Sequence, residues 1–184
     1  MASGSGSNFQ AIIDSVDRGT IDAKITGLIA GKPHIKAIER ANKHDIPVTI
    51  LTQKGSSEFE KELLSVLQKL KPDLIVLAGF LRKIPDQVVS AYPDRIINIH
   101  PSLLPKYGGK GFYGEHVHRA VIESGDSESG CSVHYVNEQY DEGDIIAQVR
   151  VPVKADDTPD SLAKRVLEEE HKLLPNVIAK LLTT

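Results

Sequence analysis

Residues 95–105, with the sequence RIINIHPSLLP, contain two side chains that could act on a reacting carbonyl group, Asn98 and His100. Side chains two residues apart in a strand point to the same face, so these two should lie together. An amide N–H can donate to a developing oxyanion, and an imidazole can carry a proton near neutral pH. Pro101 ends the strand at the edge where open α/β sheets bind ligands. The alternative is a histidine with a purely structural role.

The opening of the chain could bind an anion. The sequence SGSGSN runs into a helix whose apolar stripe comprises Phe9, Ile12, Ile13 and Val16, and Ser7 or Asn8 is a suitable N-cap. Glycines let the backbone approach a ligand, and the N–H groups of a first helical turn suit a phosphate. A flexible glycine-rich tail is the alternative.

Four apolar runs predict strands at residues 25–30, 46–51, 73–80 and 95–100, and helices are predicted between them. Alternation of strands and helices predicts an α/β protein with a mostly parallel, twisted sheet. The loops after parallel strands meet at one edge, so we expect the glycine-rich loop and the Asn98/His100 pair to share a cleft.

The second half of the chain predicts an antiparallel edge. Residues 131–136 and 144–153 read as strands joined by the short link NEQYDEG, which places Asp141 at a turn. A turn role is the simpler explanation of this residue. A final helix begins after Thr158, and Pro175 should kink or split it.

Composition indicates one globular domain over residues 1–184, because 184 residues with 40% hydrophobic content suffice for one core. A net charge of −3 with mixed signs favours neither nucleic acid nor a membrane surface. The single cysteine, Cys131, and the absence of long apolar runs lead us to expect a soluble, cytoplasmic protein.

These features together favour group transfer between two bound molecules. No activated serine or cysteine is evident, and His116 and His118 are spaced two apart on a predicted helix, so they do not form a metal pair and we expect no metal. Asp141, if it folds over the site, would stabilise protonated His100 and raise its pKa.

The motifs ASGSGSNFQAI, LAGFLRKI, INIHPSLLPKY, YDEG and EEEHKLLP occur in an order and spacing that resembles the phosphoribosylglycinamide formyltransferases, folate-dependent enzymes of purine synthesis. The resemblance runs from residue 2 to about residue 181. It implies a Rossmann-like formyltransferase fold and transfer of a formyl group from 10-formyltetrahydrofolate to the amine of glycinamide ribonucleotide. It also implies small-molecule partners and a possible homodimer.

The resemblance assigns a role to each matching residue. The catalytic trio would be Asn98, His100 and Asp141, with Asn98 and protonated His100 stabilising the oxyanion and Asp141 moving a proton through water. Three residues, Gly6, Ser7 and Asn8, would hold the substrate phosphate, and Glu170 would contact its glycinamide end. The folate would lie against Leu81, Arg82, Lys83, Ile84, Asn98, Asn137, Glu138, Gln139, Tyr140 and Asp141. Ser132 would position a water molecule.

Two departures from the family pattern stand out. The family has an apolar strand before ASGSGSN, whereas only Met1 precedes Ala2 here, so the first family strand is expected to be missing and its neighbours to have unpaired backbone groups. The loop GGKGFYGEHV is longer than the commonest family form, and its glycine-rich part, GGKGFYG, could act as a lid.

Other functions remain open at this stage. They are formyl transfer to another acceptor, such as methionyl-tRNA or an amino sugar, hydrolysis of the formyl folate, and folate or nucleotide binding without catalysis. A dinucleotide dehydrogenase is disfavoured because SGSGSN lacks the GxGxxG spacing.

Overall fold

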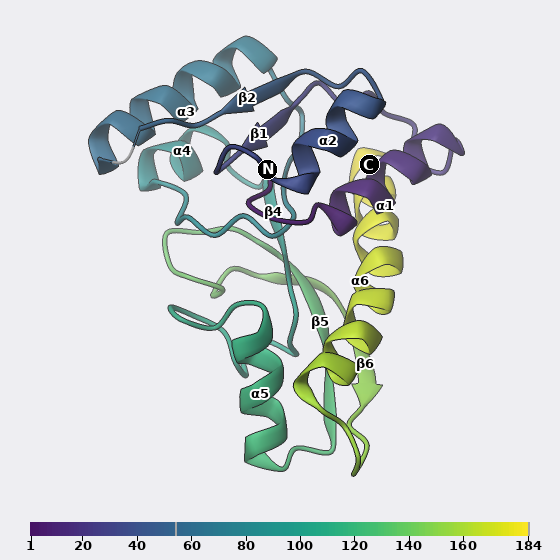
Figure 1. Ribbon diagram of the computed structural model, residues 1–184. Coiled ribbons are helices and arrows are strands. Elements are labelled where there is room, and N and C mark those ends of the chain that lie inside the picture. Colours follow the sequence, from purple (N-terminus) through teal and green to yellow (C-terminus); the bar gives the residue numbers. More distant parts are fainter. Residues whose placement is uncertain (54, 184) are drawn as a thin grey trace. The chain divides into compact units, whose positions relative to one another are not determined.

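The computed structural model describes residues 1–53 and 55–183, and the chain divides into two compact units, Met1–Ile97 and Asn98–Thr184 (Figure 1). The boundary falls inside strand β4 (Ile96–His100), whose first two residues belong to the first unit. Each unit has its own buried residues and is described separately. The single domain expected over residues 1–184 stays a prediction.

The first unit is built from alternating strands and helices, as predicted. In chain order its elements are α1 (Ser7–Asp17), β1 (Leu28–Ala30), α2 (Lys36–Lys43), β2 (Val48–Ile50), α3 (Ser56–Leu70), β3 (Ile75–Leu77), α4 (Asp86–Ala91) and the start of β4. β1 and β2 pair in parallel with Leu28 opposite Val48, and β3 neighbours β4. The parallel α/β arrangement is confirmed, although the strands are shorter than the apolar runs that predicted them.

Residues 1–3 lie between β1 and β3. Ala2 forms a parallel bridge with Ala30, its N–H donates to the Ile29 carbonyl at 3.1 Å, and its carbonyl accepts from Gly31 at 2.9 Å. On the other side the Ser3 N–H donates to the Gly79 carbonyl at 3.0 Å. The Met1 amino group donates to the Val76 carbonyl of β3 at 2.6 Å, so the Ile29 carbonyl of β1 and the Val76 carbonyl of β3 both have partners where we expected unpaired groups.

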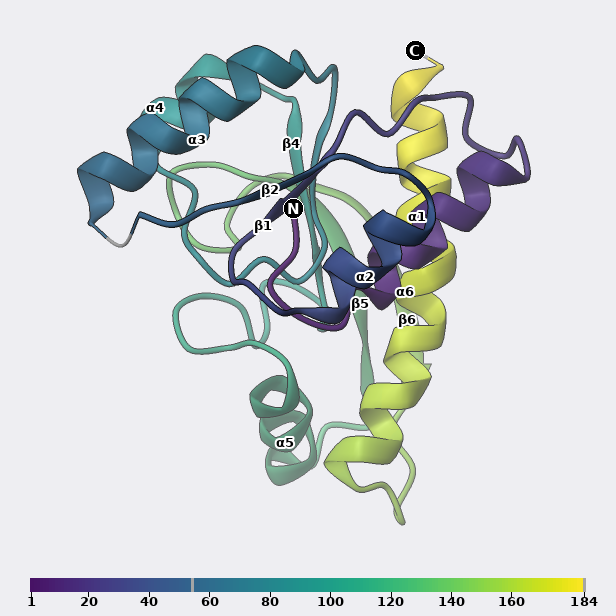
Figure 2. The same ribbon diagram turned by 45° about the horizontal axis from the view of Figure 1, so that its top comes forward.

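Helices α1 and α2 pack on one apolar cluster of the first unit and lie side by side (Figures 1 and 2). Phe9 and Ile13 are buried with Ala37 and Ala41, which confirms the predicted apolar stripe of the first helix. The small alanine side chains of α2 allow its backbone to approach the loop that precedes α1.

The second unit contains the end of β4, α5 (Glu115–Ser124), β5 (Glu128–Tyr135), β6 (Ile145–Pro152) and α6 (Pro159–Leu182). β4 neighbours β5, which pairs antiparallel with β6, so the predicted antiparallel edge is confirmed. Ser132 lies opposite Gln148, and the register shifts between Val133 and His134. Helix α6 contacts α5 and both strands of this hairpin (Figure 1).

Helix α6 corrects one expectation. It starts with the predicted cap, because Thr158 accepts a hydrogen bond from the Ser161 N–H at 3.2 Å. It then runs through Pro175 to Leu182 as one helix, so the predicted split does not occur, and the kink, the other outcome that we expected of Pro175, stays a prediction. Leu174, Pro175, Val177 and Ile178 are buried, and the burial of this apolar face offsets the hydrogen bond that proline removes. No helix within residues 1–53 and 55–183 is long and apolar enough to cross a membrane.

Candidate active site

The second unit brings the three predicted catalytic side chains together. The Asp141 carboxylate lies between the other two: its Oδ2 is 3.5 Å from His100 Nδ1, and its Oδ1 accepts from Asn98 Nδ2 at 3.4 Å. His100 is 4% exposed, and the Asp141 side chain is 13% exposed. Both separations are long for hydrogen bonds, so these groups can exchange partners with a bound substrate.

The backbone fixes which ring nitrogen of His100 carries the proton. His100 Nε2 lies 2.7 Å from the carbonyl oxygen of Tyr107, which can only accept, so Nε2 donates. Tyr107 itself is anchored, because its hydroxyl donates to Asp126 at 2.9 Å. The lone pair of neutral His100 is therefore on Nδ1 and faces Asp141, and a proton accepted by this ring enters between the two residues.

The electrostatics correct one expectation about His100. Burial lowers its pKa below the ordinary value of 6.5, and the opposing effects of the Asp141 charge and the Tyr107 carbonyl do not compensate. The predicted rise in the pKa of His100 is therefore wrong, although the carboxylate acts in the predicted direction. His100 is neutral near pH 7 and able to accept a proton.

Asp141 keeps its negative charge. Burial favours the neutral acid, but the interactions with His134, with the nearby His100 and with the Gly109 N–H together outweigh it, so the pKa of Asp141 lies below its ordinary value. The Gly109 N–H donates to Oδ2 at 2.9 Å. Asp141 has a φ of 57°, a left-handed conformation in which aspartate is one of the better tolerated residues. The turn and the site therefore use the same residue.

His134 joins the cluster and was missed in the sequence. Its Nε2 is 3.0 Å from Asn98 Nδ2 and 3.5 Å from Asp141 Oδ1, and its side chain is 2% exposed. A signal was available, since His134 and Ser132 alternate with apolar residues in CSVHYV and must share a face of their strand. A polar face on a strand beside Asn98 and His100 could have indicated a fourth member.

His118 is a third buried histidine of this unit, beside His100 and His134. It lies on α5, is 4% exposed, and its Nδ1 has no hydrogen-bond partner among the described residues. Burial, with a smaller effect from the charge of His100, lowers its pKa to about 4. His116, two residues earlier on the same helix, is exposed.

Ser132 is a buried connector in the second unit. Its Oγ donates to the Ser102 carbonyl at 2.6 Å and accepts from the Leu104 N–H at 3.1 Å and from Gln148 Nε2 at 2.8 Å. These contacts fasten the SLLP segment, which follows β4, to the hairpin. They use the hydroxyl fully, and its expected role in positioning water stays a prediction.

Glu170 and the hairpin link complete the predicted residues of this unit. Glu170 lies on α6 and is 7% exposed, close enough to the Cys131 thiol for its charge to help raise the pKa of that thiol, after burial, to about 12. Asn137, Glu138, Gln139 and Tyr140 are exposed, and Asn137 Oδ1 accepts from the Gln139 N–H at 2.9 Å. Asp141 is thus the member of the link that reaches the His100 cluster.

The predicted anion loop belongs to the first unit. Gly6, not Ser7 or Asn8, is the N-cap of α1, with a left-handed φ of 69°. A Cβ on Gly6 would lie 2.7 Å from the Ala37 Cβ, so α2 leaves no room for a side chain. Arg40 Nε donates to the Ser5 carbonyl at 3.0 Å and holds the loop against α2. The loop is therefore an ordered helix start, as the anion-site prediction requires.

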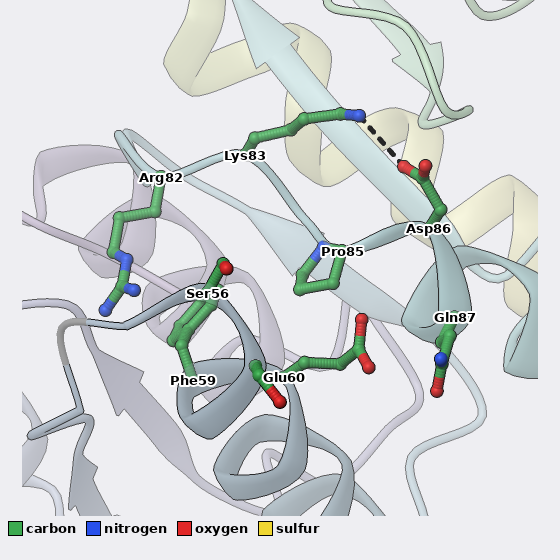
Figure 3. A pocket seen from close by; sticks show the side chains of 9 residues that line it. Ser56, Phe59, Glu60, Arg82, Lys83, Pro85, Asp86 and Gln87 are labelled. Atoms are coloured by element: carbon green, nitrogen blue, oxygen red, sulfur yellow. Dashed lines mark hydrogen bonds and ion pairs between the residues drawn. The ribbon is translucent and has the colours of Figure 1, made fainter.

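Two of the four residues predicted at 81–84 line a cavity of the first unit, about 710 Å³ in volume. These are Arg82 and Lys83, whereas Ile84 is buried and Leu81 is 49% exposed. The Arg82 guanidinium stacks 3.4 Å from the centre of the Phe59 ring, and Lys83 pairs with Asp86 at 2.9 Å (Figure 3). The remaining lining residues are Ser56, Ser57, Glu60, Pro85 and Gln87.

No group of three or more potential metal ligands occurs among residues 1–53 and 55–183. The cleft that the glycine-rich loop and the Asn98/His100 pair were expected to share stays a prediction.

Comparison with known proteins identifies the family. A model of the formyl transferase family matches residues 1–178. The chain is 40% identical over 182 residues to a phosphoribosylglycinamide formyltransferase of Escherichia coli, an alignment that covers 97% of this chain and 84% of the relative. It is 46% identical over 180 residues to a chloroplastic phosphoribosylglycinamide formyltransferase of Arabidopsis thaliana, covering 96% of this chain and 62% of the relative. The chain thus spans less than two thirds of that plant relative's length.

A solved structure supports the same assignment. The phosphoribosylglycinamide formyltransferase of Bacillus halodurans superposes with a TM-score of 0.92 at 38% sequence identity, covering 100% of this chain and 93% of that one. The family model, the bacterial relative and the shared fold agree, and the chain belongs to the formyl transferase family.

Proposed function

We propose that this chain, acting as one formyltransferase domain, transfers the formyl group of 10-formyltetrahydrofolate to the amine of glycinamide ribonucleotide in purine biosynthesis. The observation that carries the proposal is the cluster in which the side chains of Asn98 and His100 both lie within 3.5 Å of the Asp141 carboxylate, in a member of the formyl transferase family. The names of the relatives support the choice of acceptor.

The reaction begins when the substrate amine attacks the formyl carbon. The new C–N bond forms as the carbonyl electron pair moves to oxygen, and an N–H of Asn98 donates to this oxyanion. The attacking nitrogen, now positively charged, loses a proton. Neutral His100 accepts it at Nδ1, directly or through water, because Nε2 is committed to the Tyr107 carbonyl.

Asp141 stabilises the imidazolium that results. Its carboxylate faces His100 Nδ1 at 3.5 Å and carries a negative charge because its pKa is lowered. The proton then passes to the leaving nitrogen of the folate as the C–N bond to the formyl carbon breaks and the carbonyl re-forms. Holding both reactants in place contributes as well, since effective molarities for oriented groups reach about 10⁵ M or more.

The remaining sites follow the family resemblance. We assign the substrate phosphate to the backbone of Gly6, Ser7 and Asn8, and the glycinamide end to the Glu170 carboxylate. The folate is assigned to residues 81–84 and 137–141. Helix α1 favours an anion at its start through its dipole and its N–H groups. A cytoplasmic location and a homodimer belong to the same proposal.

The test is turnover with defined acceptors. Purified protein is mixed with 10-formyltetrahydrofolate and glycinamide ribonucleotide, and the change in folate absorbance and the formylated product are both followed. We expect one formylated product per folate consumed. Consumption of the formyl folate without an acceptor would indicate hydrolysis. Turnover only with methionyl-tRNA or an amino sugar would indicate a formyltransferase with a different acceptor. Binding of both ligands without formation of product would indicate a protein that binds folate and nucleotide without catalysis.

A further inference from the structure

We propose that His134 is a positioning residue that aims the side-chain amide of Asn98 at the reacting oxygen. This inference rests on the proposed formyl transfer and adds a fourth residue to its site. The Nε2 atom of His134 lies 3.0 Å from Asn98 Nδ2, closer than the Asp141 Oδ1 atom, which lies 3.4 Å from the same nitrogen.

The tautomer of His134 follows from its other ring nitrogen. Nδ1 lies 2.7 Å from the carbonyl oxygen of Tyr135, and a carbonyl only accepts, so Nδ1 carries a proton. In a ring that carries a single proton, that proton is therefore on Nδ1 and the lone pair is on Nε2. It accepts a hydrogen bond from the amide of Asn98.

Asp141 fixes the direction of the amide. If the amide were turned over, its oxygen would lie 3.4 Å from Asp141 Oδ1 and would face the lone pair of His134. Two acceptors would then oppose the amide oxygen, which is unfavourable in a buried site. Nδ2 is therefore the atom that faces both residues.

The consequence concerns the two hydrogens of Nδ2. His134 takes one of them at 3.0 Å, and Asp141 holds the other only weakly at 3.4 Å. The second hydrogen is the one available to an oxyanion, and its direction is set by the first. His134 thus acts through Asn98 without touching the substrate.

Two substitutions separate aiming from simple packing. His134→Gln can place an amide oxygen where Nε2 lies and so retain an acceptor for Asn98, whereas His134→Leu has a similar volume and no acceptor. Because losing one oxyanion donor costs about 10²-fold to 10³-fold in kcat, we expect the Leu variant to lose at least tenfold in kcat with KM within about threefold of wild type. The Gln variant should recover most of that loss.

A spectroscopic measurement on the wild-type protein needs no substrate. Long-range proton–nitrogen NMR correlations of the imidazole rings report which nitrogen is protonated. We expect a protonated Nδ1 in His134 and a change in the Nε2 resonance on Asn98→Leu substitution. A protonated Nε2 in the neutral ring, or an Nε2 resonance unaffected by Asn98→Leu, would overturn the proposal.

The activity arm has its own contrary outcomes. An equal loss of kcat in folded His134→Gln and His134→Leu, or an unchanged kcat in His134→Leu, would overturn the role of His134 in aiming the Asn98 amide. Absence of turnover in the wild type would instead defeat the proposed function, and the NMR result would still decide whether His134 holds the Asn98 amide.

Discussion

Replacing His118 with leucine should reduce the loss of unfolding free energy that occurs as the pH falls below 6.5. Burial lowers the pKa of His118 from 6.5 to about 4, so the unfolded chain binds a proton at this residue at a higher pH than the folded protein does. Its contribution to stability is present above pH 6.5 and is lost progressively as the pH falls from 6.5 toward 4. Each unit of pKa difference corresponds to about 1.4 kcal/mol.

The size of the effect follows from that window. Between pH 7 and pH 4.5, the proton uptake of the unfolded state at His118 should cost the wild type roughly 2 to 3 kcal/mol of unfolding free energy. The His118→Leu variant lacks this term and should lose that much less over the same range. Titrating groups that do not interact with His118 contribute equally to both proteins and cancel in the comparison, and the interaction with His100 is the smaller of the two causes of the His118 shift.

The assay is urea unfolding followed by circular dichroism at several pH values. His116→Leu is the matched control, because His116 is exposed and lies two residues earlier on α5. We expect the control to keep the wild-type pH dependence. Parallel profiles for the wild type and His118→Leu would refute the argument, since they would mean that burial does not hold His118 neutral.

Three further predictions follow from particular contacts. Gly6→Ala should lower the unfolding free energy by roughly 2 to 4 kcal/mol, because it puts an alanine in a left-handed conformation and its Cβ clashes with α2. Gly4→Ala, whose Cβ would have nothing within 4 Å, should change the unfolding free energy little, and equal melting curves for the two variants would contradict this prediction. Ser132→Ala should lower the unfolding free energy by roughly 2 kcal/mol, because two donors and a carbonyl lose their hydrogen-bond partner. Ser129→Ala is the control on the same strand: its Oγ has no hydrogen-bond partner among the described residues, and its unfolding free energy should be nearly that of the wild type in the same denaturation assay. The rate of formyl transfer should fall with decreasing pH only below the ordinary histidine pKa of 6.5, because the pKa of His100 is lowered and its neutral form accepts the proton. A rate that already falls with decreasing pH above pH 6.5 would count against His100 as the proton acceptor.

Much of the fold could be predicted because the sequence patterns have local causes. The apolar stripe of α1 and the parallel strands follow from periodicity, and the cap at Thr158 follows from a residue type suited to that position. The uninterrupted course of α6 through Pro175 could not be predicted, because it depends on how one face of the helix is buried by other segments.

In the candidate site, too, some features could be predicted from the sequence and others could not. Period two placed Asn98 beside His100, and the turn at Asp141 was visible in the hairpin link. The pKa direction of His100 was not visible, because it is set by the balance between its burial and the Asp141 charge. The N-cap of α1 was assigned to the wrong residue because Gly6 has a left-handed conformation and lies against α2, and contacts with a later helix are not visible in the local sequence.

The central claim is that His100 carries the proton of a formyl transfer. Its most direct test measures His100→Ala for turnover with glycinamide ribonucleotide and 10-formyltetrahydrofolate, and for binding of each by calorimetry, beside His116→Ala as an exposed control. We expect turnover to fall by at least about 10²-fold with both affinities retained, and the control to match the wild type. Turnover by His100→Ala close to that of the wild type would contradict the claim.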